Sequence, residues 1–376
     1  MRILLLDQFS ELGGAQRMLL DLLPALHERG WQAALGLPGD GPLCRCAREF
    51  GCEVLTIDCG PYALGRKSLP DFWRFVTDSP RLARQIGRLA KEFEPETIYI
   101  NGPRLLPAAA RAELRQPVVF HAHISITQPL VRFLAGHSLA RLNARTIAVS
   151  ETVAAGWRPY TQATVIYNGV AGRRPRARSP LQKTPLIGCI GRISPEKGQV
   201  EFLKAAAKIN KALPGARFLI CGAPLFSDPA ALAYERRVRE HAAGLPVTFT
   251  GWVSDVHPIL QELDLLLVPS VWPEPNPRVV LEAFAAGLPV IALNVGGLPE
   301  IIDHGRTGFL CHTPAEMADL AVELMADGAF LNRVAEAARE SWQANFTLER
   351  WQQQVLAEIE RTAGRAPATH AAAQRP

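Results

Sequence analysis

The chain has 376 residues, of which 48% are hydrophobic and 20% are charged, and its formal net charge is +5. This composition excludes a disordered chain, and the length is too great for one ordinary hydrophobic core, so two domains are expected. The first apolar run, Ile3 to Leu6, is too short for a membrane span or a signal-peptide core. We therefore expect a cytoplasmic protein.

The seven cysteines do not predict a metal site. Cys189, Cys221 and Cys311 lie in apolar, strand-like runs, where a thiol behaves as a small hydrophobic side chain. The other four lie closer together but form no C-x-x-C pair, and the predicted secondary structure changes between them: Cys44, Cys46, Cys52 and Cys59. No metal and no cofactor are expected from this pattern.

Strand-like and helix-like runs alternate through the first half of the chain. After the opening strand, apolar residues repeat at helical spacing up to Gly30: Ala15, Met18, Leu19, Leu22, Leu23 and Leu26. Strands are predicted at residues 2–8, 33–37, 53–57, 97–101, 118–123, 146–150 and 164–168. This alternation is typical of a mostly parallel sheet with covering helices.

A basic stretch interrupts this pattern between residues 66 and 91. Seven cations stand against Asp71 and Asp78: Arg66, Lys67, Arg74, Arg81, Arg84, Arg88 and Lys91. Such a stretch is usually a solvated helix face, and the alternative is attraction to an anionic membrane or a phosphate-bearing acceptor. Nucleic acid is not favoured, because stacking aromatic residues are not interleaved with the cations.

Residues 169–185 are rich in Arg, Pro and Gly without apolar periodicity, and we interpret them as a linker. Beyond them the alternation begins again, with predicted strands at residues 186–191, 217–222, 247–252, 263–270 and 289–294 and a helix from about 199 to 213. The fold class is therefore α/β, with two Rossmann-like, doubly wound parallel-sheet domains. Residues 364–376 have nothing to bury and are expected to be a disordered tail.

In such sheets ligands bind where strands end and helices begin, so we searched those positions. Gly13 and Gly14 precede the first helix, where exposed N–H groups favour an anion, although a tight turn without a ligand also explains a glycine pair. In the second half, GRISPEKG places Arg192 and Lys197 around Pro195 at a helix start. Two cations there suit a diphosphate, and surface charge is the alternative.

The stretch WPEPNPRVVLEAFAAGLPV carries two acidic side chains, Glu274 and Glu282. Pro277 fits the first helical position and Gly287 the helix stop, so Glu274 lies in the loop and Glu282 on the helix. Carboxylates accept hydrogen bonds from sugar hydroxyls, and the two are spaced to hold different parts of one extended ligand. For Glu282 a capping or exposed helix residue is the alternative.

In the first half, VVFHAHIS ends a strand with His121 and His123, whose side chains point to the same side because strand residues alternate. A single histidine is more often a satisfied core residue. At the carboxyl end of a strand, general-base or hydrogen-bonding duty becomes the competing interpretation.

Taken together, these motifs resemble the retaining, nucleotide-sugar-dependent glycosyltransferases of family 4, which have the GT-B fold. The resemblance rests on GGAQR, GRISPEKG and E-x7-E followed by AFAAGLPVIA, GGLPEII and TGFL, and it runs to about Thr347. It implies an N-terminal acceptor domain at 1–170, completed by a C-terminal helix at about 347–363, and a donor domain at 184–346, with a cleft between them.

By this resemblance the catalytic residues are Glu274, His123, Arg192 and Lys197. The implied donor-binding set is Gly13, Gly14, Arg192, Lys197, Glu274, Asn276, Arg278, Val279 and Glu282. Arg192 and Lys197 would contact the diphosphate, Glu282 the ribose and Glu274 the transferred sugar, while His123 fits the strand-end histidine better than His121. The implied reaction retains the anomeric configuration, and the leaving diphosphate helps to deprotonate the acceptor hydroxyl without a metal.

Two departures from the family pattern stand out. Members commonly carry E-P-F-G where this chain has Glu274-Pro275-Asn276-Pro277, so a backbone N–H is lost and Arg278 is a candidate to take part instead. The common N-G-V-D is Asn168-Gly169-Val170-Ala171, a change we assign to the linker.

Several questions stay open at this stage. The donor is a UDP- or GDP-sugar of the hexose type, and the expected acceptor is a glycan or a lipid-linked oligosaccharide of the cell envelope. Contact with the inner membrane face is one interpretation of the basic stretch. The rival functions are a nucleotide-sugar epimerase or hydrolase of the same fold and a non-catalytic nucleotide-sugar-binding protein.

Overall fold

A computed structural model describes residues 1–60, 69–173, 175, 184–224 and 229–365, with residues 69–76 and 229 as backbone alone. The chain divides into two compact units. Unit 1 is Met1–Tyr167 together with the chain from Trp351 onward, and unit 2 is Asn168–Arg350. Arg66 and Lys67 of the basic stretch, and most of the predicted tail, lie outside the described residues.

The described part of unit 1 contains a seven-stranded parallel sheet in the order β3-β2-β1-β4-β5-β6-β7. Its strands are β1 (Arg2–Leu6), β2 (Gln32–Leu37), β3 (Glu53–Thr56), β4 (Thr97–Ile100), β5 (Val118–Ala122), β6 (Arg145–Ala148) and β7 (Ala163–Val165). Its helices are α1 (Gly14–Glu28), α2 (Pro42–Glu49), α3 (Leu69–Phe93), η1 (Pro103–Leu105), α4 (Leu106–Ala109), α5 (Pro129–Leu142), α6 (Glu151–Trp157) and α14 (Leu348–Thr362). The order reverses between β1 and β4, the position where doubly wound sheets bind ligands.

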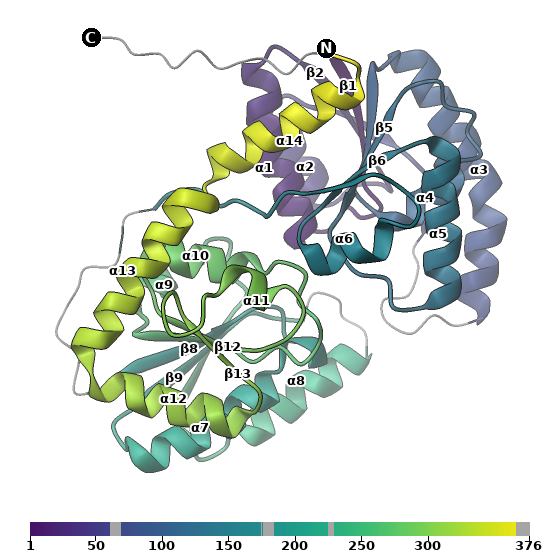
Figure 1. The fold of residues 1–376 in the computed structure, drawn as a ribbon. Coiled ribbons are helices and arrows are strands. Elements are labelled where there is room, and N and C mark those ends of the chain that lie inside the picture. Colours follow the sequence, from purple (N-terminus) through teal and green to yellow (C-terminus); the bar gives the residue numbers. More distant parts are fainter. Residues whose placement is uncertain (61–68, 174, 176–183, 225–228, 366–376) are drawn as a thin grey trace, which may run out of the picture. The chain divides into compact units, whose positions relative to one another are not determined.

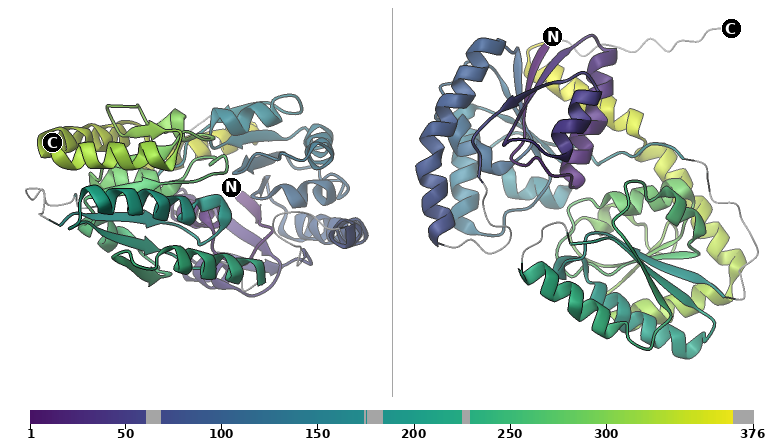
Figure 2. Two further views of the ribbon diagram at one scale, coloured as in Figure 1. Left: turned by 90° about the horizontal axis from the view of Figure 1, so that it is seen from below. Right: turned by 180° about the vertical axis from the view of Figure 1, so that it is seen from behind.

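The helices of unit 1 cover both faces of its sheet (Figures 1 and 2). Helices α3, α4 and α5 lie side by side on one face, and α1 and α2 lie on the other. The strands therefore read as continuous apolar runs, as expected for sheets covered on both sides.

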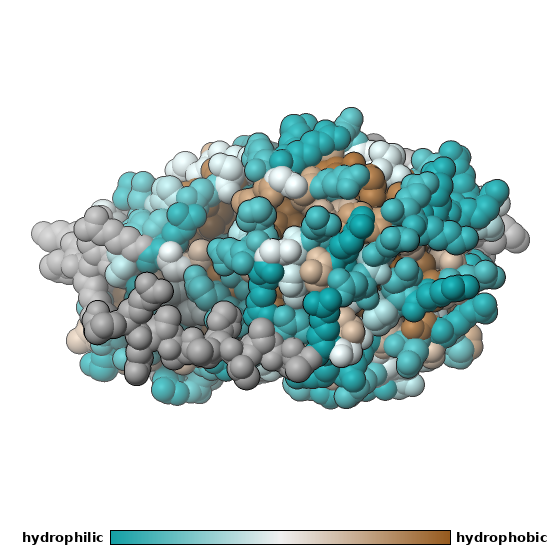
Figure 3. All heavy atoms as spheres, turned by 90° about the horizontal axis from the view of Figure 1, so that it is seen from above, coloured by the Kyte–Doolittle hydropathy of each residue, from teal (hydrophilic) through white to brown (hydrophobic). Residues whose placement is uncertain are grey.

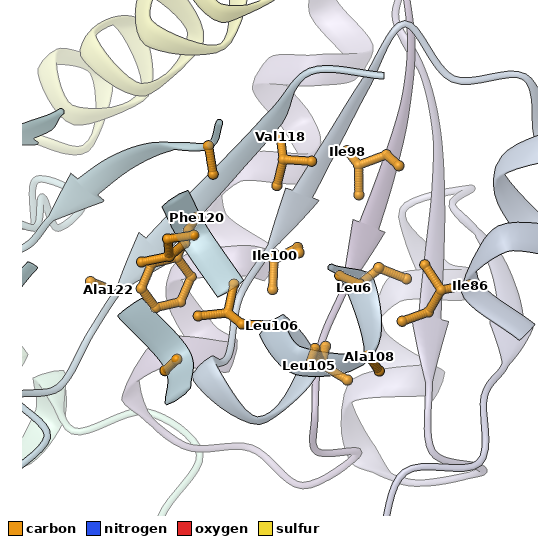
Figure 4. Close-up of a cluster of buried hydrophobic side chains, with 14 of the residues drawn as sticks. Leu6, Ile86, Ile98, Ile100, Leu105, Leu106, Ala108, Val118, Phe120 and Ala122 are labelled. Atoms are coloured by element: carbon orange, nitrogen blue, oxygen red, sulfur yellow. The ribbon is translucent and has the colours of Figure 1, made fainter. Parts of the chain in front are cut away.

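Figure 4 shows the core under α3 and α4. Alternate strand residues point to one side there and meet the helices, and all of the labelled side chains are less than 2% exposed: Leu6, Ile86, Ile98, Ile100, Leu105, Leu106, Ala108, Val118, Phe120 and Ala122. Burying a large apolar side chain of this kind contributes about 1.5–3 kcal/mol. The core thus fixes the strand ends that carry the polar residues described below.

Unit 2 contains, within its described residues, a six-stranded parallel sheet in the order β10-β9-β8-β11-β12-β13. Its strands are β8 (Leu186–Ile190), β9 (Arg217–Cys221), β10 (Val247–Gly251), β11 (Leu265–Val268), β12 (Val290–Leu293) and β13 (Phe309–Cys311). Its helices are η2 (Pro195–Lys197), α7 (Gln199–Ala212), α8 (Pro229–His241), α9 (His257–Glu262), α10 (Arg278–Ala286), α11 (Leu298–Ile301), α12 (Pro314–Ala326) and α13 (Gly328–Asn345). Here the order reverses between β8 and β11. The predicted fold class, two doubly wound α/β domains, is confirmed.

The two chain segments that leave unit 2 run side by side. Val170 donates its N–H to the carbonyl of Phe346 at 3.0 Å, and its carbonyl accepts from Leu348 at 3.0 Å and from the indole of Trp342 at 3.2 Å. Beyond this point α14 packs within unit 1, where the amide of Gln352 donates to the carbonyl of Asp21 at 2.6 Å. Unit 1 is therefore discontinuous in sequence.

Candidate functional site

The loops that follow β8, β11 and β12 of unit 2 are fastened to one another. Val271 donates its N–H to the carbonyl of Glu196 at 3.0 Å, which joins the first loop to the second. Gly198 has φ +69°, and a Cβ there would stand 1.9 Å from the carbonyl oxygen of Pro269, so only glycine allows this approach. These contacts hold the carboxyl edge of the sheet at its switch point.

The third loop supports the backbone of Glu274. Gly297 donates its N–H to the Glu274 carbonyl at 2.6 Å. Gly296 has φ +60°, and a Cβ there would meet the backbone oxygen and nitrogen of Glu274 at 2.4 and 2.5 Å. The pair Gly296-Gly297 therefore supports the Glu274 loop.

The side chain of Glu274 is paired with Lys197. Lys197 Nζ lies 2.6 Å from Glu274 Oε1, and the hydroxyl of Ser270 donates to the same oxygen at 2.7 Å. The Lys197 side chain is 28% exposed and that of Glu274 is 11% exposed, so the pair stands at the surface of the edge. The structure thus brings together two predicted site residues that lie 77 positions apart.

Arg192 lies on the same edge with its charge in solvent. Its side chain is 38% exposed, and its guanidinium lies 3.9 Å from Glu196 Oε2. Its backbone is held by Gln199, which is fully buried and donates from Nε2 to the Arg192 carbonyl at 2.8 Å while accepting from Ser194 at 3.3 Å. The backbone that carries the Arg192 side chain is therefore fixed.

On α10, Arg278 and Glu282 form a pair four residues apart, with Arg278 Nε 3.6 Å from Glu282 Oε1. The helix begins at Arg278 and ends at Ala286, and Gly287 caps it with φ +68° as the predicted stop. Pro277 caps the helix and is not its first residue, so that prediction was wrong by one position. Proline has no N–H, so Pro277 at the cap leaves no backbone donor unsatisfied. The first N–H groups of the helix are those of Arg278 and Val279.

Asn276 is 5% exposed, and its carbonyl accepts a hydrogen bond from Asn168 at 3.0 Å. Neither polar atom of its side chain has a hydrogen-bond partner among the described groups. A buried amide without partners is costly, so this side chain calls for one.

The corresponding edge of unit 1 carries a buried network of polar side chains. Asp7 follows β1 and Asn101 follows β4, and both are buried. The Asn101 amide donates to Asp7 Oδ2 at 2.6 Å, and Gln16 donates to both Asp7 oxygens at 3.1 Å. Gln16 also accepts from the N–H of Gly13 at 3.2 Å, which fixes the glycine loop.

His123 completes this network from the end of β5. Its Nε2 lies 2.8 Å from Asn101 Oδ1, and because the Asn101 amide nitrogen faces Asp7, Nε2 must carry the proton. Its Nδ1 is left as an acceptor. Burial lowers the pKa of His123 to about 3, so the ring is neutral and suits hydrogen bonding better than general-base catalysis.

His121 turns out to be a core residue with only one ring nitrogen paired, since its buried Nε2 has no hydrogen-bond partner among the described groups. It is 1% exposed, its Nδ1 is hydrogen-bonded to the hydroxyl of Tyr99, and its ring stacks on Trp351 of α14 at 6.4 Å. Burial, with a smaller effect of His123, lowers the pKa of His121 well below its ordinary value. The rings of His121 and His123 lie 3.9 Å apart, so the predicted common side is correct.

Comparisons with known proteins agree with this geometry. The family model "Glycosyltransferase Family 4" matches residues 12–172, and "Glycosyl transferases group 1" matches residues 173–341. The two models meet between the units and cover most of the chain. The chain belongs to the group 1, family 4 glycosyltransferases.

This glycosyltransferase chain spans only part of the length of the two named transferases given next. Sulfoquinovosyl transferase SQD2 of Arabidopsis thaliana is 28% identical over 79% of this chain and 64% of its own. A GDP-mannose-dependent alpha-(1-6)-phosphatidylinositol monomannoside mannosyltransferase of Mycobacterium tuberculosis is 34% identical over 44% of this chain and 40% of its own. The crystal structure of Anabaena HepE in complex with UDP and glucose has a TM-score of 0.80 at 25% identity, covering 96% of this chain and 99% of the other.

Sequence reasoning missed several residues that hold the candidate site in place. Asp7, Gln16, Asn101, Gln199 and Ser270 were not singled out, although Asp7 and Asn101 each lie at the carboxyl end of a predicted strand. That position was the available signal for these two. Gln16, Gln199 and Ser270 carry none, because their partners are set by folding.

Among the described residues no group of three or more His, Cys, Asp or Glu side chains is arranged to hold a metal ion. None of the described helices is both long and apolar enough to cross a bilayer.

Proposed function

We propose that this chain transfers a hexose-type sugar from a UDP- or GDP-linked donor to a hydroxyl of a glycan or lipid-linked acceptor, with retention at the anomeric carbon. The observation that carries the proposal is the Lys197–Glu274 pair at 2.6 Å, on an edge whose loops are fastened to one another. A cation and a carboxylate held side by side suit the two halves of a nucleotide sugar, its diphosphate and its hydroxyl-rich sugar.

Lys197 and Arg192 are assigned to the diphosphate. Lys197 is held in place by Glu274, whereas the half-exposed Arg192 stands on a loop that Gln199 fixes. Cations that are already positioned stabilise the negative charge of a leaving diphosphate without reorganisation during the reaction. These two side chains supply the charge that a divalent ion supplies elsewhere, so the proposed reaction is metal-independent.

Glu274 is assigned to the hydroxyls of the transferred sugar and Glu282 to the ribose. Oε1 of Glu274 accepts hydrogen bonds from Lys197 and Ser270. These two contacts also fix the direction in which the other carboxylate oxygen points. The buried amide of Asn276 and the first-turn N–H groups of Arg278 and Val279 are assigned to the donor as well. Asn276 stands where the family carries the Phe of Phe-Gly, and its amide offers a donor in place of the N–H that Pro277 lacks.

From unit 1, Gly13 and Gly14 are assigned to the phosphate side of the donor and His123 to a sugar hydroxyl. A Cβ at Gly14 would meet nothing within 4 Å, so the first turn of α1 is open to a ligand. The neutral His123, with its proton on Nε2, offers Nδ1 as an acceptor for a hydroxyl. The acceptor hydroxyl loses its proton to the departing diphosphate on the same face of the sugar.

Similarity to named proteins supports the donor class but leaves its base open. HepE was crystallised with UDP and glucose, whereas the mycobacterial relative is named for GDP-mannose. The names of the plant and mycobacterial relatives include a sulfoquinovosyl and a phosphatidylinositol group, respectively. We therefore propose a cell-envelope glycan or a lipid-linked acceptor at the inner membrane face.

Thermal-shift measurements with UDP, GDP and their hexose derivatives test this proposal first. A ligand that binds only the folded chain raises its melting temperature, and at 100 times its dissociation constant the gain is about 2.7 kcal/mol. The shift should be lost in Arg192→Ala and kept in Arg217→Ala, which alters an arginine at the start of β9. No shift with any nucleotide would overturn the proposal.

A second experiment separates the rival functions. The chain is incubated with a labelled nucleotide sugar, with and without a mixture of membrane-derived acceptors. Transfer that depends on acceptor supports the proposal. Rapid release or epimerisation of the sugar without acceptor identifies a hydrolase or epimerase, and binding without any turnover identifies a non-catalytic protein.

A further inference from the structure

The beginning of helix α5 in unit 1 carries a concentration of exposed apolar side chains, which we call the α5 patch. Its members, with their exposed fractions, are Ile124 (46%), Leu130 (61%), Val131 (37%), Phe133 (50%) and Leu134 (40%). The other large apolar residues that are exposed among the described ones are single residues and one adjacent pair: Phe50, Leu232, Trp252, and Val271 with Trp272. Scattered residues need no explanation, whereas a contiguous patch marks an interaction site.

The orientation of α5 is the reverse of an ordinary surface helix. Its inward side is made mostly of small residues, and Gly136 packs so closely that a Cβ would stand 2.4 Å from the ring of Tyr160. The large apolar residues face solvent instead. In a helix that served the fold alone these large side chains would be buried, because a large apolar side chain stabilises the folded state more when it is removed from water than when it is exposed.

The chain segment that carries the patch has charge of a single sign. The sequence has no Asp or Glu between Glu113 and Glu151, whereas Arg132 is exposed within the patch and Arg141 is exposed at the far end of α5. Exposed Phe and Leu beside Arg, without carboxylates, is the pattern of helices that lie in the interface of an anionic bilayer.

We propose that the α5 patch docks on the surface of an anionic membrane, with Leu130 and Phe133 in the acyl boundary and Arg132 at the phosphates. A second copy of the chain fits less well. Symmetric pairing through this patch would bring Arg132 close to its own copy, with no acidic residue of this segment to neutralise the two charges. Figure 3 shows one face of the molecule, on which hydrophilic side chains predominate and hydrophobic ones are interspersed.

The patch begins at Ile124, directly after His123, so docking would bring the strand end assigned to the sugar close to lipid-linked acceptors. This consequence rests on the proposed function, but membrane docking itself does not. The docking surface is defined without the basic stretch, for which membrane contact was the alternative to a solvated helix face, because Arg66, Lys67 and the side chain of Arg74 are not described and Arg81 pairs with Asp58 at 2.6 Å.

Sedimentation of the full chain with lipid vesicles, without any nucleotide, tests the proposal. We expect binding to vesicles of equal parts phosphatidylcholine and phosphatidylglycerol, and at least tenfold weaker binding to phosphatidylcholine alone. Leu130→Ser combined with Phe133→Ser should weaken binding at least tenfold, and so should Arg132→Glu. Matched changes on α8, Leu232→Ser and Arg237→Glu, should leave binding unchanged.

Three results would overturn the inference. The first is a wild type that binds neither kind of vesicle, and the second is patch variants that bind vesicles as well as the wild type does. The third is a dimer in sedimentation velocity that the patch substitutions dissociate while vesicle binding persists. If the double variant does not fold, Arg132→Glu carries the test alone. Nucleotide binding measured on the same variants should not change, which separates failure of docking from failure of the proposed transferase function.

Discussion

The two units share one topology but equip its switch point with opposite chemistry. In unit 2 the edge beside β8 and β11 carries charged, partly exposed side chains, with Lys197, Glu274 and Arg192 at its surface. In unit 1 the edge beside β1 and β4 carries Asp7, Asn101 and the neutral His123 in a buried network. The parallel sheet supplies the same place in both units, and the side chains decide what each place can bind.

This difference suggests a division of labour. Fixed charges at the surface suit a diphosphate, because attraction to its negative charge offsets the free-energy cost of removing water from them. A neutral acceptor on a rigid network suits a hydroxyl, which needs direction more than charge. Each prediction below alters one edge and leaves the other intact.

Lys197→Ala should have the largest effect. It removes the cation assigned to the leaving diphosphate, and the loss of a preorganised electrostatic contact lowers kcat by about 100- to 1000-fold. The control is Lys204→Ala, which breaks an exposed pair with Glu201 on α7 and should leave kcat unchanged. Equal effects of both changes in steady-state kinetics would contradict the role of the Lys197 edge.

Gly296→Ala compared with Gly305→Ala tests whether the Glu274 loop needs the support of Gly296. Both glycines have positive φ, +60° and +80°, but only at Gly296 does a Cβ clash with the backbone of Glu274. Gly305→Ala should lower the free energy of unfolding by about 1 kcal/mol through backbone strain alone. Gly296→Ala should cost at least about 3 kcal/mol or displace the loop, because its clash adds to the strain. Denaturant unfolding and activity measure this, and similar losses would show that the contact is not needed.

Asn101→Ala should disturb the unit 1 edge. It removes the partner that orients His123 and one donor to Asp7, and we expect kcat to fall about tenfold, equivalent to about 1.4 kcal/mol. Nucleotide affinity should stay the same, since the charges of unit 2 are untouched. Asn345→Ala, at an exposed asparagine near the end of α13, is the control. A weaker affinity with unchanged kcat would assign Asn101 to binding.

The smallest effect is a change in how stability depends on pH. The pKa of His123 is lowered by burial from 6.5 to about 3, so its contribution is full above pH 6.5 and is lost as pH falls toward 3. Burial raises the pKa of Asp7 from 3.8 to about 6, so its contribution is lost as pH rises through this range. The two groups change the free energy of unfolding with pH in opposite directions. Each changes it by at most about 1.4 kcal/mol per pH unit.

Single variants separate these two slopes. In denaturant unfolding between pH 4 and pH 6.5, His123→Asn should lose less stability on acidification than the wild type. Asp7→Asn should lose more. Parallel curves for all three proteins would show that neither group titrates with the shifted pKa.

The sequence was a good guide wherever structure is local. Helical spacing around Met18 and Leu22, the glycine stops and the strand runs each depend on neighbours in the chain, so they predicted the elements closely. The departure at Pro277, a cap in place of a first helical residue, is a shift of one position within a correctly predicted helix start.

Function-bearing positions were predicted only in part. Glu274, Lys197 and His123 were found because they follow strands or carry a family pattern. The choice between His121 and His123 needed the fold, since one ring stacks on Trp351 of the distant α14 while the other meets Asn101. The sequence also did not predict that the large apolar residues of α5 face solvent. Which side of a helix packs on the core is known only once the core is known.

The sequence by itself determined the alternation of strands and helices, the glycine turns and the charged residues at strand ends, because these follow from spacing along the chain. Only the tertiary structure decided which of those residues meet. Asp7, Gln16, Asn101 and His123 come from four separate elements, and Lys197 meets Glu274 across two loops. The strand order sets these meetings, and it arises from packing between segments that share no local pattern.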